Sequence, residues 1–270
     1  WSTTTGSDAG DGVTPEKLFD MSYGDLCLNL MDTHRVERFP YDWRLPLNHL
    51  AGQLEKFLRR LMDETNIPLR PIRLLAHSMG GLVVRALIHQ NPQLWDELMG
   101  RAGARFIMLG TPNQGAHSMV EALLGKSDTL RSLARVDLQH DLQAILNIIG
   151  EFRGALQLLP KTGFRDVGET PFDEYYSVTR WSALKAEMKD FWFGDRVAAV
   201  PSEAALNQGK WLWDRDGLAT PALPERHTDK TIYVHGSAPL TACGMQKIDG
   251  RWKMIGTNEG DGTVTWKSGA

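Results

Sequence analysis

The clearest pattern in the chain is a short apolar run, a turn of small residues and a longer amphipathic segment. The run covers Ile72 to Ala76, the turn is Ala76-His77-Ser78-Met79-Gly80, and no helix breaker follows before Asn91-Pro92. An apolar run of this length predicts a buried strand, and an uninterrupted amphipathic segment predicts a helix. The sequence therefore predicts a strand, a sharp turn and a helix in direct succession.

The chain before this stretch also alternates between strand and helix signals. Residues 1–12 are polar and glycine-rich, which is typical of a loop, and Thr14-Pro15-Glu16 predicts the start of a short helix. Residues 36–41 predict a short strand. Apolar residues from Leu47 to Leu61 recur at helical spacing and predict an amphipathic helix that Thr65-Asn66-Ile67-Pro68 ends. This order of elements predicts a parallel sheet.

A further strand is predicted at residues 105–109, directly before the loop Gly110-Thr111-Pro112-Asn113-Gln114-Gly115. Ligand-facing loops of parallel sheets lie at the carboxyl ends of the strands, so this loop is expected to border the pocket that contains Ser78. By composition alone, a plain Gly/Pro turn explains the loop equally well.

Residues 116–228 interrupt the alternation with helical segments and no convincing sheet strand. The segments are Ser118–Leu124, Leu130–Leu159 and Trp181–Phe191. An interruption of this length between two core strands predicts an inserted helical cap rather than a loop. Such a cap would cover the serine and supply an apolar acyl pocket, although most of its aromatic residues are expected to form the cap's own core.

Strand signals return near the end of the chain. Residues 231–236 predict a core strand, and residues 245–248 and 251–255 flank Asp249-Gly250, which predicts a hairpin. The predicted fold class is α/β, with a mostly parallel sheet and an inserted helical cap. In this division residues 1–115 form the first part of the core, 116–228 the cap and 229–270 the second part of the core.

Composition narrows the class of protein. The chain has 270 residues, of which 42% are hydrophobic and 23% charged, which suits one α/β domain or a core with a cap. Its net charge of −3 gives no electrostatic case for nucleic acid or an anionic membrane, and no apolar run approaches the ~18 residues of a transmembrane segment. Cys27 and Cys243 could form one bridge or none and lack metal-ligand spacing. We expect neither a metal nor a cofactor. No signal peptide is visible, which favours the cytoplasm.

Ser78 is the candidate nucleophile. In a small-x-Ser-x-Gly turn between strand and helix, a strained backbone lifts the serine Oγ above the edge of the sheet. The helix that follows directs its free N–H groups at the site, so the backbone N–H of Met79 is a candidate oxyanion-hole donor. Ala76 and Gly80 are expected where the strand and helix backbones nearly touch. The alternative is a structural serine in an ordinary strand-to-helix turn.

Asp261 is the candidate acid of a catalytic triad, because triads built on such turns follow the chain order serine, acid, histidine. It lies in a glycine-flanked loop after a late strand, where an ordinary turn aspartate is an equally good explanation. Glu259 and Asp249 are weaker candidates, the latter because the hairpin turn already accounts for it.

None of the eight histidines follows Asp261. His77 adjoins the serine with its side chain expected to point away from Oγ, and His235 precedes the acid. The other histidines have surface, helix-face or linker interpretations: His34, His49, His89, His117, His140 and His227. We therefore expect the catalytic histidine beyond Ala270, the second oxyanion donor before Trp1, and other domains in a longer parent chain. A segment that lacks sheet strands is expected to be poorly soluble alone.

Five spaced motifs that together span most of the chain resemble a known family. They are Phe39-Pro40-Tyr41-Asp42-Trp43-Arg44, Ala76-His77-Ser78-Met79-Gly80-Gly81, Leu109-Gly110-Thr111-Pro112, Leu156-Gln157-Leu158-Leu159-Pro160 and Gly260-Asp261-Gly262-Thr263-Val264. Their types and order resemble the lecithin:cholesterol acyltransferase-like branch of the α/β-hydrolases, which includes lysosomal phospholipase A2 and bacterial lipase-like relatives. The chain departs from that pattern where Ala76 replaces a glycine, and the disulfides of secreted members have no evident counterpart.

The resemblance implies an α/β-hydrolase fold with a nucleophile elbow and a lid, and a serine hydrolase of lipase or phospholipase type. The substrate would be a lipid or another acyl ester. Ser78 matches the family's nucleophile, Asp261 its triad acid and the Met79 N–H its oxyanion hole, whereas Asp42 and Arg44 match a motif whose role looks structural. A lipid acyltransferase that uses the same acyl-enzyme and a degenerate, non-catalytic domain used for binding are the alternatives. The substrate-binding residues are left open.

Overall fold

The computed structural model of the chain describes residues 15–64, 70–167, 174–213 and 223–270. In chain order its elements are α1 (Asp20–Met31), α2 (Leu47–Glu64), β1 (Arg73–His77), α3 (Met79–Gln90), α4 (Pro92–Gly100), β2 (Arg105–Leu109), α5 (His117–Leu123), α6 (Asp128–Val136), α7 (Leu142–Ile149), α8 (Arg153–Leu156), α9 (Val178–Glu187), α10 (Glu203–Gly209), the 3₁₀ helices η1 (Lys210–Leu212) and η3 (Glu225–Lys230), β3 (Thr231–Val234), β4 (Thr241–Ile248), β5 (Arg251–Thr257) and α11 (Trp266–Gly269).

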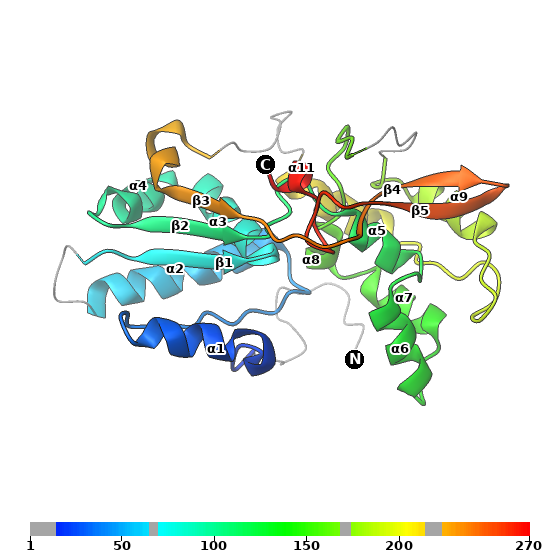
Figure 1. Cartoon of the computed structure of the whole chain (residues 1–270), viewed down its shortest axis with the longest axis horizontal. Coiled ribbons are helices and arrows are strands. Elements are labelled where there is room, and N and C mark those ends of the chain that lie inside the picture. Colours follow the sequence, from blue (N-terminus) through cyan, green and yellow to red (C-terminus); the bar gives the residue numbers. More distant parts are fainter. Residues whose placement is uncertain (1–14, 65–69, 168–173, 214–222) are drawn as a thin grey trace.

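Strands β1, β2 and β3 form a parallel sheet in that order, which confirms the predicted parallel sheet. The observed bounds of β2 are those predicted, residues 105–109. Ala76, Phe106 and Met108 are buried on one face of this sheet, where α3 packs on β1 and α2 packs on α3. In Figure 1 the sheet lies at one end of the long axis and the β4–β5 hairpin toward the other, with α5 and α11 between them.

Two predictions for the start of the chain are wrong. Residues 36–41 form no strand; they run as irregular chain in which Phe39 packs on Phe57 of α2, with ring centroids 5.2 Å apart. Phe39 thus packs against a helix instead of belonging to a strand of the sheet. The first helix begins at Asp20 and not at Pro15, which is non-helical, while Thr14 and residues 1–12 lie outside the described residues.

Helix α4 is an element that the sequence pattern did not predict. Asn91 and Pro92 indicated only the end of the preceding helix, yet they also start the next one. The Asn91 side chain accepts the Leu94 N–H at 3.0 Å, and Pro92 occupies the first helical turn, where it loses no hydrogen bond.

The described parts of the segment between β2 and β3 contain helices joined by irregular chain and no strand, as predicted, but the predicted helical stretch of residues 130–159 is divided into α6, α7 and α8. The break after α6 has a local cause. The Asp137 side chain accepts the N–H groups of Gln139 and His140, and Asp141 then caps α7 by accepting the Ala144 N–H at 2.8 Å. The spacing of apolar residues does not predict where side chains such as Asp137 and Asp141 bind backbone N–H groups and interrupt a helix.

The predicted hairpin around Asp249-Gly250 is confirmed, and both turn residues have the positive φ that a tight hairpin turn needs. Among the strands that the structure describes, β4 and β5 pair with each other and form a second sheet. The hairpin contacts α9, where the Trp252 indole N–H donates to Glu187 at 2.6 Å and Lys247 lies 3.0 Å from the same carboxylate.

Candidate active site

The carboxyl edge of the parallel sheet brings three loops side by side. Ser78 follows β1, Gly110 follows β2, and residues 235–238 follow β3. The Ser78 N–H donates to the Leu109 carbonyl at 2.8 Å, and the Gly110 N–H donates to the Val234 carbonyl at 2.9 Å. Backbone hydrogen bonds therefore continue beyond the strands and fix these loops relative to one another. This is the edge at which parallel α/β sheets bind their ligands.

Ser78 occupies a strained backbone conformation between β1 and α3. Its φ of 51° and ψ of −124° lie outside the regions that non-glycine residues favour. The residue is half-buried, and within the described part of the chain its hydroxyl has no hydrogen-bond partner and does not cap α3. The turn thus presents a free Oγ at the edge of the sheet, beside the start of a helix.

Gly80 faces Ala76 of β1, and the tightest contact of α3 behind this turn is made by the next residue, Gly81. A Cβ on Gly80 would make ordinary contacts, at 3.6 Å from the Tyr41 hydroxyl and 3.7 Å from Ala76 Cβ. A Cβ on Gly81 would overlap Thr111, whose Cγ2 would lie only 2.6 Å away. Helix α3 is therefore pressed against the loop after β2, one turn beyond the serine.

Met79 begins α3, so its backbone N–H has no preceding helical carbonyl to accept it. Its side chain is buried against Gly154, where a Cβ would also overlap the backbone carbonyl oxygens of Trp43 and Leu45. The Gly154 N–H in turn donates to the Arg44 carbonyl at 3.1 Å. The segment around residue 44 therefore supports the start of α3 through a glycine on α8.

Asp42 and Arg44 fix the conformation of that supporting segment. The Asp42 carboxylate accepts the Arg44 backbone N–H at 3.0 Å and the Arg44 guanidinium at 2.6 to 3.0 Å. Next in the chain, the Leu47 N–H at the start of α2 donates to the buried Gln157 side chain at 2.6 Å. The Leu47 contact ties the start of α2 to the motif of residues 156–160, and the Asp42–Arg44 pair makes contacts that hold the backbone of its own motif.

Asp261 lies against the loop after β2. A Cβ on Gly110 would come 2.6 Å from Asp261 Oδ2, whereas Oδ1 accepts the N–H groups of Thr263 at 2.9 Å and Val264 at 2.8 Å. Burial raises the pKa of Tyr233 to about 12, and the nearby Asp261 charge adds to that rise. Oδ1 thus stabilises the turn. Oδ2 faces the loop after β2, and Ser78 lies in the loop after the neighbouring strand, β1.

No hydrogen bond among the described residues joins a histidine to Asp261. His77 Nδ1 lies 2.7 Å from the Tyr23 hydroxyl, and His227 Nε2 lies 3.2 Å from Asp96. The exposed His235 ring packs near the Tyr233 and Trp266 rings, with centroids 5.1 and 5.9 Å away. The structure therefore brings the serine and aspartate loops to one edge and leaves the third group of a triad unassigned.

His117 is not on a surface or an ordinary helix face, as the sequence suggested. Its side chain is 1% exposed, and Nδ1 lies 3.2 Å from Oδ2 of Asp166, which is equally buried. Thr265, four residues after Asp261, donates its hydroxyl to the same carboxylate. Sequence reasoning missed these three residues because their partners are far apart in the chain and none belongs to a short motif with known chemistry.

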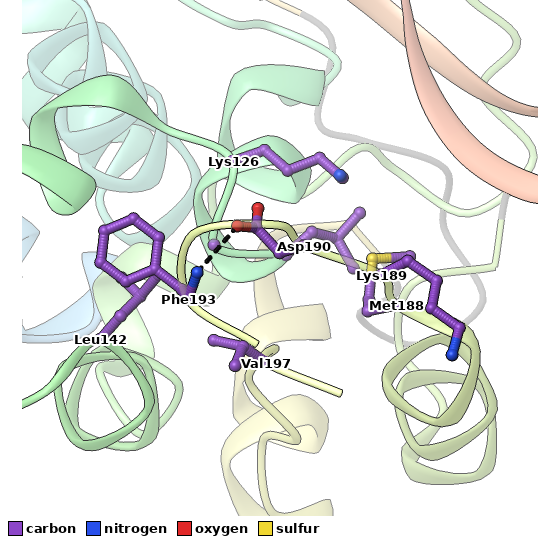
Figure 2. A pocket seen from close by; sticks show the side chains of 9 residues that line it. Lys126, Leu142, Met188, Lys189, Asp190, Phe193 and Val197 are labelled. Atoms are coloured by element: carbon purple, nitrogen blue, oxygen red, sulfur yellow. Dashed lines mark hydrogen bonds between the residues drawn. The ribbon is translucent and has the colours of Figure 1, made fainter. Parts of the chain in front are cut away.

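The pocket in Figure 2 is separate from this edge. Its lining comprises Leu124, Gly125, Lys126, Leu142, Met188, Lys189, Asp190, Phe193 and Val197. The carboxylate that lines the pocket, Asp190, already has hydrogen-bond partners: it accepts from Arg131 at 2.7 Å and from the Phe193 N–H at 3.0 Å. These bonds, Arg131 first, lower the pKa of Asp190 to about 2. The pocket is a structural junction between α6 and the turn after α9.

Over the described ranges, Cys27 and Cys243 are both free and buried, so the two do not form a bridge. The same residues include no group of three or more histidines, cysteines and carboxylates placed to hold a metal ion. None of the helices in the described part of the chain is long and apolar enough to span a bilayer.

Comparison with known proteins identifies the class of protein. The fold is mixed α/β with a small parallel sheet, consistent with an α/β-hydrolase-like fold. The sequence model of the lecithin:cholesterol acyltransferase family matches residues 31–184, more than half of the chain. The chain therefore belongs to the lecithin:cholesterol acyltransferase family. No curated protein matches it.

Two solved structures are similar to parts of the chain. Phospholipase PlaB from Legionella pneumophila is 18% identical, with a TM-score of 0.34, over 52% of this chain and 33% of that one. A structure of the Tle4–Tli4 complex is 15% identical, with a TM-score of 0.45, over 84% of this chain and 57% of that one. The chain thus spans one third and just over half of the lengths of these two proteins.

Proposed function

We propose that this chain carries the nucleophile and the acid of a serine-dependent lipid acyl-ester hydrolase that works through an acyl-enzyme on Ser78. Membership of the lecithin:cholesterol acyltransferase family supports the lipid acyl ester as substrate class. The observation that carries the proposal is the strained Ser78 turn between β1 and α3, with a free hydroxyl. We interpret this turn as a nucleophile elbow.

In the proposed reaction Ser78 Oγ attacks the ester carbonyl carbon while a general base removes the hydroxyl proton. The Met79 N–H donates to the oxyanion that forms on the carbonyl oxygen. When the carbon–oxygen bond to the alcohol breaks, the alcohol leaves with the proton held by the base. Water then attacks the acyl-enzyme by the same steps and releases the fatty acid and free Ser78.

The role proposed for Asp261 is to orient and stabilise a histidine base. Oδ2, directed at Gly110 beside the Ser78 loop, is the oxygen available for that role, since Oδ1 is held by the turn. The base itself is left unassigned, since no hydrogen bond among the described residues joins a histidine to Asp261.

The domain division is part of the same proposal. Residues 1–115 and 229–270 would form the catalytic core, and residues 116–228 the cap. The helices α5 to α10 between β2 and β3 support this division, as does the burial of Trp181 and Trp213 within that segment. Trp192, by contrast, is 75% exposed, so not every cap aromatic contributes to a core.

Acyl transfer to an alcohol is the second candidate function, favoured by the acyltransferase for which the family is named. Hydrolysis and transfer share the acyl-enzyme and differ only in whether water or an alcohol attacks it. Product analysis with a phospholipid substrate, with and without an added long-chain alcohol, separates them. Formation of the alcohol's ester at the expense of free fatty acid would establish acyl transfer.

Labelling with a fluorescent fluorophosphonate tests the nucleophile directly. Ser78 Oγ would displace fluoride from phosphorus and leave a stable adduct. We expect labelling of the wild type and of Ser127→Ala, and none of Ser78→Ala. Ser127 is a matched control because it precedes α6 and makes no capping hydrogen bond. Absence of labelling in a folded wild-type protein would favour the degenerate, non-catalytic alternative.

A further inference from the structure

Asp166 is a buried carboxylate that the proposed reaction does not use. Its side chain is 1% exposed. Oδ1 accepts the Val167 N–H at 2.9 Å and the Thr265 hydroxyl at 2.7 Å, while Oδ2 lies 2.9 Å from the same hydroxyl and 3.2 Å from His117 Nδ1. Burying a carboxylate costs free energy unless hydrogen-bond donors surround it. Here the donors are the adjacent Val167 N–H and two side chains from segments remote in the chain.

Thr265 connects Asp166 to the loop of the proposed acid. Gly260 and Thr265 form an antiparallel bridge at the base of that loop, and the Asp261 N–H donates to the Val264 carbonyl at 3.1 Å. The Thr265 hydroxyl has one proton, which it donates to Asp166, and its oxygen accepts the Ser268 N–H at 3.2 Å. The base of the Asp261 loop is thus attached to a fixed carboxylate.

His117 connects Asp166 to the loop after β2. His117 begins α5, directly after the loop of residues 110–116 whose Gly110 faces Asp261. Ser268 joins the same two segments, because its hydroxyl donates to the Gly115 carbonyl and its own carbonyl accepts the Gln114 N–H at 3.0 Å. The two loops that meet at Asp261 Oδ2 are therefore both anchored close to Asp166.

We propose that Asp166 is a positioning residue for the catalytic acid: through Thr265 and His117 it holds the Asp261 loop in register with the loop after β2. This inference rests on the proposed function, since Asp261 matters only if Ser78 is acylated. Misplacing a catalytic group by about 1 Å can cost on the order of 100-fold in rate, so a buried anchor outside the site can affect the chemistry strongly.

The test measures the second-order rate constant of fluorophosphonate labelling in two backgrounds, wild type and Asp261→Asn. In the wild-type background, Asp166→Asn and Thr265→Val are expected to slow labelling by roughly tenfold or more, and Thr265→Ser, which keeps the hydroxyl, by less than about threefold. In the Asp261→Asn background, Asp166→Asn and Thr265→Val should change the rate by less than about twofold, because residues that act as a unit are non-additive.

Asp190→Asn is the matched control, since it removes another bonded carboxylate of the same segment and should leave the labelling rate unchanged in both backgrounds. Equal slowing by Asp166→Asn in both backgrounds, or no slowing in the wild type, would overturn the positioning role. If Asp166→Asn does not fold, the pair Thr265→Val and Thr265→Ser decides by the same criterion. Failure of the wild type to label would count against the proposed function instead.

Discussion

At the scale of single residues, Asp261 divides its two oxygens between structure and the proposed chemistry. Oδ1 accepts two N–H groups of its own turn, and Oδ2 points at Gly110, where the absence of a Cβ makes room for it. The two interpretations of this residue that the sequence left open, turn aspartate and triad acid, are therefore compatible. A substitution that preserves the turn can separate them.

Asp261→Asn is expected to lower kcat for p-nitrophenyl ester hydrolysis roughly 10³- to 10⁴-fold, because an amide cannot stabilise a charged imidazole as a carboxylate does. The asparagine oxygen can still accept the Thr263 and Val264 N–H groups, so the melting midpoint should change little. Steady-state kinetics and thermal unfolding on the same samples check both parts.

Glu259→Gln is the control for that substitution. Glu259 lies two residues earlier in the same loop, is exposed, and takes part through its backbone, where its carbonyl accepts the Trp266 N–H at 2.9 Å. The kcat of Glu259→Gln should remain within about twofold of the wild type, since the Glu259 side chain is outside the proposed triad. A loss comparable to that of Asp261→Asn would mean that Glu259 contributes to the reaction and that the acid is misassigned.

At the scale of elements, the contact between α3 and the loop after β2 depends on one glycine. Gly81→Ala is expected to destabilise the protein by about 1–3 kcal/mol, because its Cβ would overlap Thr111 and the backbones would have to separate. Gly80→Ala should be tolerated, since its Cβ would make only ordinary contacts. Denaturant unfolding of the two variants measures the difference.

Gly52 provides the matched control for the effect of removing a helical glycine. It lies in α2, and a Cβ there would meet no atom within 4 Å. Gly52→Ala should therefore raise the free energy of unfolding by about 0.5–1 kcal/mol through backbone entropy alone. If Gly81→Ala is as stable as Gly52→Ala, the close approach of α3 to Thr111 does not exist in solution.

Elements were predictable where one local signal sets them. The strand at 105–109 and the amphipathic helix from Leu47 follow from periodicity, and the hairpin follows from Asp249-Gly250. Periodicity failed at residues 36–41, where aromatic residues pack on α2, and within residues 130–159, where Asp137 and Asp141 bind backbone N–H groups and divide the helix.

Candidate residues of the site were predictable in the same local sense. Ser78 stands out because a strand, a small-residue turn and a helix adjoin it, and Asp261 because glycines flank it after a strand. The Asp166 cluster was not predictable, because its contacts join residues 49 and 99 positions apart. Which of the two glycines has no room for a Cβ also depends on Thr111, whose position is set by the sheet and not by the turn.

At the scale of the whole molecule, one face of the parallel sheet carries apolar side chains that the described residues cover only in part, with Tyr23 of α1 against His77 at its β1 edge. Along that face the register places Leu75, Ile107 and Ile232 side by side across the three strands. Leu75 is 40% exposed, Ile232 44% and Val234 45%. Parallel sheets normally bury both faces, so an apolar row that remains accessible to water favours association with another surface.

We therefore expect residues 1–270, expressed alone, to self-associate, with a sedimentation coefficient that rises with concentration. The double substitution Ile232→Thr and Val234→Thr should reduce association, because threonine keeps the strand propensity and removes apolar area. Leu138→Thr is the control, since Leu138 is 99% exposed but lies between α6 and α7, away from the sheet. Association that responds equally to both changes would locate the contact elsewhere, and a monomeric wild type would show that this apolar row does not drive association.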